Sequence, residues 1–281
     1  MVEFCERRVT AQDGLSLYVR DYGDPLSPRP AVLCLGGLTR NARDFEDLAP
    51  HLATHRRVVC PDYRGRGRSN YDADWRHYTA AVYLRDILDI LAALDLHRVV
   101  VIGTSMGGLL AMALAVARPG ALRAVVLNDI GPEIDPAGLA RIKTYVGGDE
   151  RPADWDRAVI FVKQQFLHDG LTSDDQWLNF AKRIYTEDQD GAIRLDYDPA
   201  ISKPLGAAAT ADYWPAFNAL RQFPLLAIRG ALSDILSLET FARMAREHPD
   251  LTAITLDGIG HVPLLDEPQS VSAIDDFLAA L

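Results

Sequence analysis

The sequence predicts an α/β fold with a mostly parallel sheet, and three observations lead to this expectation. Short continuous runs of β-branched apolar residues recur along the 281-residue chain. Stretches with a helical apolar period lie between these runs, and one long stretch in the second half lacks strand-like runs of that strength. Continuous apolar runs are typical of strands buried on both faces, and strands that alternate with helices form parallel sheets with crossover connections.

Six such runs supply the expected strands of the sheet. They lie at 31–35, 57–60, 98–102, 123–127, 225–228 and 252–256. Ahead of them, the segment "RRVTAQDGLSLYVRDYG" places an Asp-Gly pair between two β-rich stretches. Because Asp-Gly favours the tight turn of a β-hairpin, we expect an antiparallel hairpin at the edge of the sheet.

Two helices are indicated in the first half of the chain. Between residues 78 and 96, apolar residues repeat at i, i+4, i+7, i+8 and i+11 and form one stripe, with charged residues outside it. The segment that starts at "SMGGLLAMALAVA" is apolar nearly all round, which predicts a central buried helix that Pro119 and Gly120 terminate.

Residues 131–216 are expected to form a mainly helical insertion, a cap or lid on a core of residues 1–130 and 217–281. Several prolines punctuate the ends of this stretch, and it contains neither a repeat nor a low-complexity linker. Aromatic residues stand among its helix-like segments and are candidates for the roof of a substrate pocket, although packing is the commoner role for such rings. They are Trp155, Trp177, Tyr185 and Trp214.

Composition and charge narrow the class of protein. The formal net charge is -10, and the sequence lacks the basic stripe that binding to a phosphate backbone requires, so we expect no nucleic-acid partner. The three cysteines lack Cys-x-x-Cys spacing and fit a reduced compartment. No run approaches the length of a membrane span, and the N-terminus lacks the apolar centre of a secretion signal. These features predict a cytoplasmic protein with no membrane association.

The segment "VIGTSMGG" contains a G-x-S-x-G motif formed by Gly103, Ser105 and Gly107. An expected strand precedes it and an expected helix follows it directly. A turn this tight leaves no room for side chains two residues before and after the serine, which explains both glycines. Because the helix begins at the serine, unpaired backbone N–H groups point to the place where negative charge would develop. The motif predicts that Ser105 is a nucleophile, against the alternative of a helix N-cap.

A nucleophilic serine needs a general base, and His261 is the best placed of the seven histidines. It lies in the glycine-flanked loop "DGIGHVPLLDEP", after the expected strand 252–256 and near the end of the chain. In the motif order of serine, acid and histidine, the base comes last. The alternative for a loop histidine is a solvated surface position.

Two aspartates compete for the role of the acid that orients the imidazole. Asp234 follows the expected strand 225–228, and chain order and glycine context favour it. Asp129 follows the strand before, also at a carboxyl end, and stays an alternative. An aspartate ahead of a helix can also be an N-cap, which is the competing interpretation of Asp234.

An oxyanion hole requires two backbone N–H groups that converge on one point. The residue after the nucleophile, Met106, is expected to supply one of them. Leu38, in the loop "GGLTRN" after strand 31–35, is the candidate for the other, and Gly36 and Gly37 would allow the backbone to turn inward. An ordinary glycine turn is the alternative.

Three segments together resemble the α/β-hydrolase superfamily over nearly the full chain. "GTSMGG" looks like its nucleophile elbow, "PDYRGRGRS" is similar to its D-x-R-G-x-G-x-S turn, and "GIGHVPLLDEP" looks like its G-x-G-H-x-P end segment. The resemblance implies an eight-stranded, mostly parallel sheet with a helical cap, and it supports a triad of Ser105, Asp234 and His261. One departure is Gly36-Gly37, where many relatives carry His-Gly. A serine at the elbow favours acyl chemistry, since related dehalogenases and epoxide hydrolases place an aspartate there.

The expected activity is that of an ester-bond hydrolase of the carboxylesterase or lactonase type, with a small acyl substrate and an acyl-enzyme on Ser105. No metal-ligand spacing and no G-x-G-x-x-G after a strand are present, so no cofactor is expected. A C–C bond hydrolase, a thioesterase or a perhydrolase would use the same three residues, and the sequence does not separate them. A rival of another class is a non-catalytic receptor for a small ligand. Nothing in the sequence indicates the oligomeric state.

Overall fold

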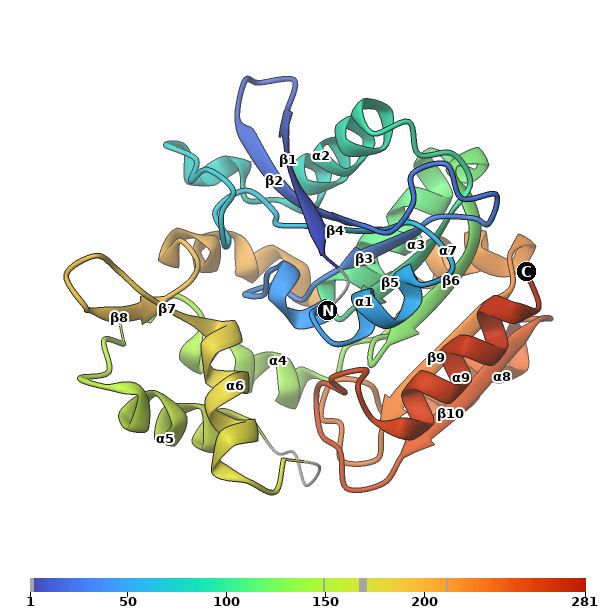
Figure 1. Cartoon of the computed structure of the whole chain (residues 1–281). Coiled ribbons are helices and arrows are strands. Elements are labelled where there is room, and N and C mark those ends of the chain that lie inside the picture. The colour runs from blue at the N-terminus through green and yellow to red at the C-terminus, as the bar shows by residue number, and fades with distance from the viewer. Residues whose placement is uncertain (1–2, 149, 167–170, 211) are drawn as a thin grey trace.

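An eight-stranded sheet with the order β1-β2-β4-β3-β5-β6-β9-β10 forms the centre of the molecule (Figure 1). The computed structural model describes residues 3–148, 150–166, 171–210 and 212–281. The strands are β1 (Phe4–Thr10), β2 (Ser16–Tyr22), β3 (Val32–Leu35), β4 (Val58–Pro61), β5 (Val99–Thr104), β6 (Leu122–Asn128), β9 (Leu225–Gly230) and β10 (Leu251–Leu256). β2 pairs antiparallel with β1 and β4, and the other neighbours are parallel. The mostly parallel sheet with an antiparallel hairpin at its edge is therefore confirmed.

Helices cover both faces of this sheet. Side chains of the central strands alternate between two apolar cores, as the pleat requires, so that Val101 lies in one core and Val100 and Ile102 lie in the other. The first core contains residues of α2 (Ala80–Ala93), α3 (Met106–Ala117), α7 (Trp214–Asn218) and α8 (Leu238–Glu247), and the second contains residues of α1 (Leu48–Ala53) and α9 (Pro268–Ala279). In the part of the chain that the structure describes, no helix is long and apolar enough to cross a membrane.

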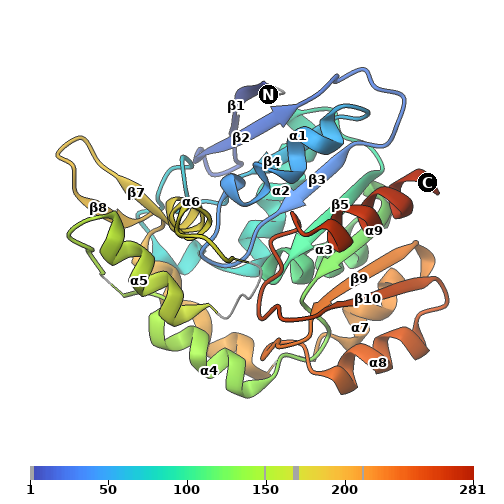
Figure 2. The same cartoon turned by 60° about the horizontal axis from the view of Figure 1, so that its bottom comes forward.

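Between β6 and β9 the chain leaves the sheet and forms a separate group of elements, which we call the cap. It consists of α4 (Pro136–Tyr145), α5 (Trp155–Gln165), α6 (Asp174–Ile184) and the antiparallel hairpin of β7 (Tyr185–Glu187) and β8 (Ile193–Leu195). Both views show α5, α6 and the hairpin together at one side of the molecule (Figures 1 and 2). The insertion is mainly helical, and its short hairpin was not predicted from the sequence.

After β8 the chain returns to the core through residues 196–198, which we call the return segment. The Gly67 N–H donates to the Asp196 carbonyl oxygen at 2.9 Å, and the Asp198 N–H donates to the Gly65 carbonyl oxygen at 2.8 Å. Both glycines belong to the turn 62–70 that follows β4. A 3₁₀ helix (Pro199–Thr210) and α7 then lead to β9. The cap is thus joined at its end to a loop of the core.

Candidate active site

Ser105 lies at the turn between β5 and α3, and its backbone is strained there, with φ 51° and ψ -115°. A Cβ on Gly103 would lie 2.6 Å from backbone atoms of Gly107, and a Cβ on Gly107 would lie 2.1 Å from the carbonyl oxygen of Leu35. Both distances are far below van der Waals contact, so only glycine fits at either position. The turn holds the serine at the carboxyl end of the central strand β5.

The structure brings His261 to Ser105, as the sequence predicts. The Nε2 atom of His261 lies 3.1 Å from Ser105 Oγ, and the imidazole is largely buried. The loop between β10 and α9 carries this histidine. Asn128, the last residue of β6, donates from Nδ2 to the Pro263 carbonyl oxygen at 2.9 Å and to Thr104 Oγ1 at 3.0 Å. The histidine loop is therefore fastened to the ends of the two strands beside the serine.

Asp129 is the carboxylate that contacts the imidazole. Its Oδ2 atom lies 2.7 Å from His261 Nδ1 and also accepts the Ser233 hydroxyl at 2.6 Å. Its Oδ1 atom accepts the Gly230 N–H at 2.9 Å. The carboxylate is fully buried, and these donors fix its orientation. Such a partner favours the tautomer with the proton on Nδ1, which leaves Nε2 to accept the proton of Ser105.

This geometry corrects the preferred acid, because Asp234 does not contact His261. Asp234 instead forms a bidentate pair with Arg141 of α4, at 2.5 Å to Nε and 2.8 Å to Nη2. Burial raises the pKa of Asp234, but the hydrogen bond and charge of Arg141, with a smaller contribution from His261, bring it below its usual value. The physical reason is the distance from the strand end: Asp129 directly follows β6, whereas Asp234 lies four residues beyond the end of β9 and pairs with Arg141 of α4.

The amides expected to form the oxyanion hole have no hydrogen-bond acceptor within the described ranges. Met106 is the first residue of α3, where an N–H group has no partner inside the helix. The Leu38 N–H likewise has none, and Leu38 lines the same cavity as Ser105. Two free donors beside the serine hydroxyl are what an oxyanion requires.

The turn 62–70 supports the loop that contains Leu38. Arg66 is fully buried and donates from Nε to the Leu38 carbonyl oxygen at 2.9 Å. The Tyr63 hydroxyl donates to the Gly36 carbonyl oxygen at 3.2 Å, and Asp62 Oδ1 accepts the Ala42 N–H at 2.7 Å. The sequence identified this turn by its D-x-R-G-x-G-x-S pattern but not its role in supporting the Leu38 loop. The pattern was the available signal, because it places a conspicuous cluster of arginines and glycines directly after a buried strand.

A cavity of about 40 Å³ adjoins Ser105 and extends under the cap. Its lining includes Ser105, His261, Leu38, Arg40, Tyr145 and Phe166. A second, smaller cavity of about 10 Å³ shares Tyr145 and Phe166 with the first and reaches Tyr197. The two cavities together form a narrow, mostly apolar space between the carboxyl edge of the sheet and the cap.

None of the four aromatic residues predicted to form the pocket roof lines either of these two cavities, which corrects that expectation. Trp155, Trp177 and Tyr185 belong to the apolar cluster inside the cap, where they pack around α5 and α6. Trp214 lies in the core of the sheet, donates from Nε1 to Glu133, and has Arg243 over its ring. The helices turn these rings toward their own cores, so other aromatic residues face the serine.

A larger cavity of about 380 Å³ lies at the opposite edge of the sheet, where the parallel strands begin. Its lining includes Arg29, Arg57, Asp95 and Arg98. It contains neither Ser105 nor His261. Since ligands of open α/β sheets bind beyond the carboxyl ends of the strands, we assign the functional site to the smaller cavity.

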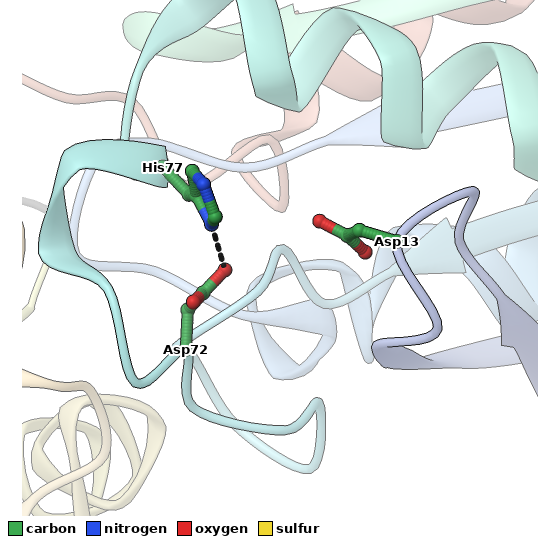
Figure 3. Close-up of side chains that lie close together, drawn as sticks. All are labelled: Asp13, Asp72 and His77. Atoms are coloured by element: carbon green, nitrogen blue, oxygen red, sulfur yellow. Dashed lines mark hydrogen bonds and ion pairs between the residues drawn. The ribbon is translucent and has the colours of Figure 1, made fainter.

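Asp13, Asp72 and His77 form the group with the closest approach to a metal site among the described residues (Figure 3). Their potential ligand atoms lie within 4.8 Å of one another, and His77 Nδ1 is 2.9 Å from Asp72 Oδ2. Arg64 Nη1 donates to the Oδ2 atoms of both aspartates, at 2.8 and 2.6 Å. The guanidinium thus supplies the positive charge that these carboxylates require.

The comparisons with known proteins agree with this fold. Residues 30–268 match the family model described as alpha/beta hydrolase fold. The chain is 34% identical over 267 residues to a 3-hydroxybutyrate-oligomer hydrolase of Cupriavidus necator, and the match covers 92% of this chain and 90% of the relative. A 2-(acetamidomethylene)succinate hydrolase of Mesorhizobium japonicum is 26% identical over 285 residues, which cover 99% of this chain and 96% of that protein.

Solved structures match over the whole length of the chain. A crystal structure of an alpha/beta hydrolase from Novosphingobium aromaticivorans superimposes with a TM-score of 0.94 at 47% identity, and the match covers 100% of both chains. The structure of an E-2-(acetamidomethylene)succinate hydrolase gives a TM-score of 0.85 at 25% identity and covers 99% of this chain and 100% of the other.

Proposed function

The chain belongs to the α/β-hydrolase fold family, and from this premise we propose that it is a serine hydrolase that cleaves a small carboxylic ester through an acyl-enzyme on Ser105. The observation that carries the proposal is the continuous series of contacts from Ser105 through His261 to Asp129. The proposal is also supported by two relatives of the chain that are named as hydrolases. A binding protein would not need a nucleophile, a base and an acid in this order.

The proposed reaction proceeds in two steps on the same residues. His261 Nε2 removes the Ser105 proton while Oγ attacks the ester carbonyl carbon, and the N–H groups of Met106 and Leu38 stabilise the resulting oxyanion. His261 then gives this proton to the oxygen of the leaving alcohol, and the acyl group stays on Oγ. In the second step His261 takes a proton from water, the hydroxide attacks the acyl-enzyme, and the proton returns to Ser105 as the acid leaves. Asp129 stabilises the imidazolium in both steps.

The choice of an ester bond is favoured over the alternatives by the nature of one relative's substrate. An oligomer of a hydroxy acid joins each hydroxyl to the next carboxyl through an ester bond, and the relative at 34% identity is a hydrolase of such an oligomer. The elbow serine is also suited to attack on a carbonyl carbon. We therefore place carboxylic esters and lactones ahead of thioesters, C–C bonds and peracid formation.

The size of the cavity indicates a short acyl group. A cavity of about 40 Å³ beside Ser105 has room for only a few atoms in this arrangement of the cap. The partner of the protein in this proposal is thus a small acyl substrate, and longer chains would require the cap to move.

An active-site phosphonate tests the proposal directly. We expect covalent labelling of wild-type protein at Ser105, no labelling of Ser105→Ala, and strongly slowed labelling of His261→Ala, because the base is needed to activate the hydroxyl. With p-nitrophenyl esters of increasing chain length, turnover should be highest for short acyl groups, and Ser105→Ala should lower kcat by about 10⁵-fold or more. If folded wild-type protein is neither labelled nor active, a non-catalytic receptor is the better explanation.

A further inference from the structure

We propose that Arg40 binds a free carboxylate of the substrate, so that the preferred esters carry a second, unesterified carboxyl group. This inference rests on the proposed function and adds the substrate class. It comes from the position of Arg40, from its hydrogen bonds and from the apolar character of the cavity around it.

Arg40 lies next to the nucleophile, in the loop that carries Leu38. It lines the same cavity as Ser105 and His261. A Cβ on Gly37 would lie 3.2 Å from Arg40 Cγ and 3.8 Å from Ser105 Cβ, so the two side chains flank this glycine. The aliphatic part of the Arg40 side chain is therefore placed close to Ser105.

The guanidinium of Arg40 is held rigidly and has one nitrogen left over. Its Nε atom donates to both carboxylate oxygens of Asp44, at 3.0 and 2.8 Å, and Nη2 donates to Asp44 Oδ1 at 2.5 Å. The Nη1 atom is buried and has no hydrogen-bond partner in the described parts of the chain. The side chain as a whole is only 7% exposed. A buried cationic donor without an acceptor is unfavourable unless a ligand or water provides one.

Arg141 is the obvious rival, because its guanidinium lies 6.0 Å from the centre of the ring of Tyr145, which lines the cavity. All three of its guanidinium nitrogens already have partners, however. Nε and Nη2 bind Asp234, and Nη1 donates to the Gln165 carbonyl oxygen at 3.1 Å. Arg141 is also more exposed than Arg40, at 32% of its side chain. Of these two cations, only Arg40 offers an unused nitrogen.

The rest of the cavity lining favours an apolar body on the ligand. Leu38, Ile142, Val146 and Phe166 surround the space, and the Arg40 guanidinium itself lies 5.0 Å from the centre of the Phe180 ring. In such surroundings a charge-assisted hydrogen bond is stronger than in water, and a planar guanidinium fixed by Asp44 loses little freedom on binding. The complementary ligand is a short carbon chain with one anionic group.

The two relatives are named for substrates of this kind. 3-Hydroxybutyrate and substituted succinate both contain carboxylate groups. An ester of a hydroxy acid or of a dicarboxylic acid retains a free carboxylate near the scissile bond. This chemistry is what the unused nitrogen of Arg40 would recognise.

The test compares two esters of one acid, monoethyl succinate and diethyl succinate, near neutral pH. They differ in charge at the end remote from the scissile bond. We expect wild-type kcat/KM to favour the monoester, and Arg40→Met to lower the ratio of monoester to diester kcat/KM by about 100-fold. The loss should be mainly in KM, because the carboxylate is bound equally in the ground and transition states. Arg40→Lys should restore part of the ratio.

Arg43→Met is the matched control. Arg43 belongs to the same 3₁₀ helix (Ala42–Phe45) that follows Arg40, and it pairs with Asp196 of the return segment at 2.7 Å without lining the cavity. Its removal deletes one positive charge close by, so the ratio of the two kcat/KM values should stay within a few-fold of the wild type. Arg141→Met, measured in parallel, tests the rival cation.

A binding measurement separates recognition from turnover. In the Ser105→Ala background, monoethyl succinate should bind by calorimetry, diethyl succinate should bind at least about 10-fold more weakly, and the added Arg40→Met should remove the difference. Phosphonate labelling of Ser105 in the Arg40→Met enzyme shows whether the nucleophile is still competent and the protein folded.

Each result bears on one of the two proposals. Equal use of both esters by an active wild-type enzyme, or a ratio that changes only in Arg141→Met, overturns the role of Arg40 and leaves the serine hydrolase intact. Failure of the wild type to be labelled or to cleave any ester overturns the proposed function instead.

Discussion

At the scale of single residues, the site is assembled from the ends of different elements. Ser105 follows β5, Asp129 follows β6 and His261 follows β10, and each residue is far from the others in sequence. Side chains of supporting residues set their orientation, as the Ser233 hydroxyl does for Asp129. The geometry of the site therefore depends on strands that are distant in sequence and end at the same side of the sheet.

Paired substitutions distinguish the two candidate acids. Asp129→Asn should lower kcat by about 10³- to 10⁴-fold, because an amide favours the wrong imidazole tautomer. The Oδ1 atom of the new asparagine can still accept the hydrogen bond from the Gly230 N–H, so the local structure should be retained. Asp234→Asn should stay within about 10-fold of the wild type, since Asp234 contacts Arg141 and acts on His261 only through charge. Steady-state kinetics with a short p-nitrophenyl ester measures both.

Thermal unfolding of the two variants provides the control for these rates. An inactive Asp129→Asn protein that unfolds near the wild-type temperature shows that the loss is catalytic. The assignment fails if Asp234→Asn is the inactive variant and Asp129→Asn keeps wild-type turnover.

The sequence identified Ser105 and His261 as partners but preferred the wrong acid. Both aspartates follow a strand at the same edge, and their contacts in three dimensions separate them: Asp129 meets His261, whereas Asp234 meets Arg141 of the cap. These contacts are long-range, and no local pattern reports them. Arg40 escaped sequence reasoning for a similar reason, because a single arginine in a loop has no motif, and its unused nitrogen is apparent only in three dimensions.

At the scale of elements, the turn from β5 to α3 is tightly constrained by backbone packing. The helix packs so closely on the neighbouring strand that Gly107 touches the backbone of Leu35 at the end of β3. The sequence predicted this turn correctly, because close backbone approach leaves a recognisable glycine pattern.

Gly107→Ala should therefore destabilise the protein by more than about 2 kcal/mol, since its Cβ would lie 2.1 Å from the Leu35 carbonyl oxygen, which is backbone and cannot move away easily. Gly120→Ala is the matched control. No atom lies within 4 Å of a Cβ at that position, so its effect should be within about 1 kcal/mol of zero. Chemical denaturation of the three proteins measures the difference, and equal stabilities would contradict the packing argument.

The hairpin of the cap could not be predicted from the sequence, because its strands are short. β7 and β8 contain three residues each, too few for an apolar run or a clear alternation. The only local signal is Asp190-Gly191 between them, a pair that favours a tight turn. The longer hairpin of β1 and β2 carries the same kind of turn but also has β-rich flanks, which is why it was predicted.

At the scale of the whole molecule, the return segment joins the cap to the core through a buried charge. Asp196 Oδ2 accepts Arg43 Nη2 at 2.7 Å and Asn41 Nδ2 at 3.0 Å. Burial raises the pKa of Asp196 to about 6, and the charge of Asp62 adds to this, whereas Arg43 and Arg194 oppose it. The connection between the two parts of the protein should accordingly respond to pH.

The folded state binds a proton at Asp196 over the pH range from its usual pKa of 3.8 to about 6, whereas the unfolded state does not. This group therefore makes the free energy of unfolding fall as the pH rises through that range, by up to about 3 kcal/mol. Relative to the wild type, Asp196→Asn should gain stability as the pH rises from about 4 to about 6. Urea unfolding of both proteins across the range measures this, and parallel profiles would refute it.

The overall architecture was predictable because it rests on local patterns that repeat. The expected runs at 98–102 and 225–228 correspond to β5 (Val99–Thr104) and β9 (Leu225–Gly230), and the apolar helix after the serine is α3. The direction in which the rings of the cap point was not predictable. Trp177 and Tyr185 could have faced either the serine or the cap interior, and only the packing of α5 on α6 decides between them.

The turn 62–70 holds the Leu38 loop with its side chains and the return segment with its backbone. The Arg66 side chain donates to the Leu38 carbonyl oxygen, and the Arg66 backbone forms an isolated β-bridge with Tyr197. The return segment and the Leu38 loop are thus attached to the same turn of the core. In the proposed reaction the Leu38 N–H stabilises the oxyanion, so the turn that anchors the end of the cap also positions one of the two donors. A substitution that loosens this turn should therefore affect the seating of the cap and the stabilisation of the oxyanion together.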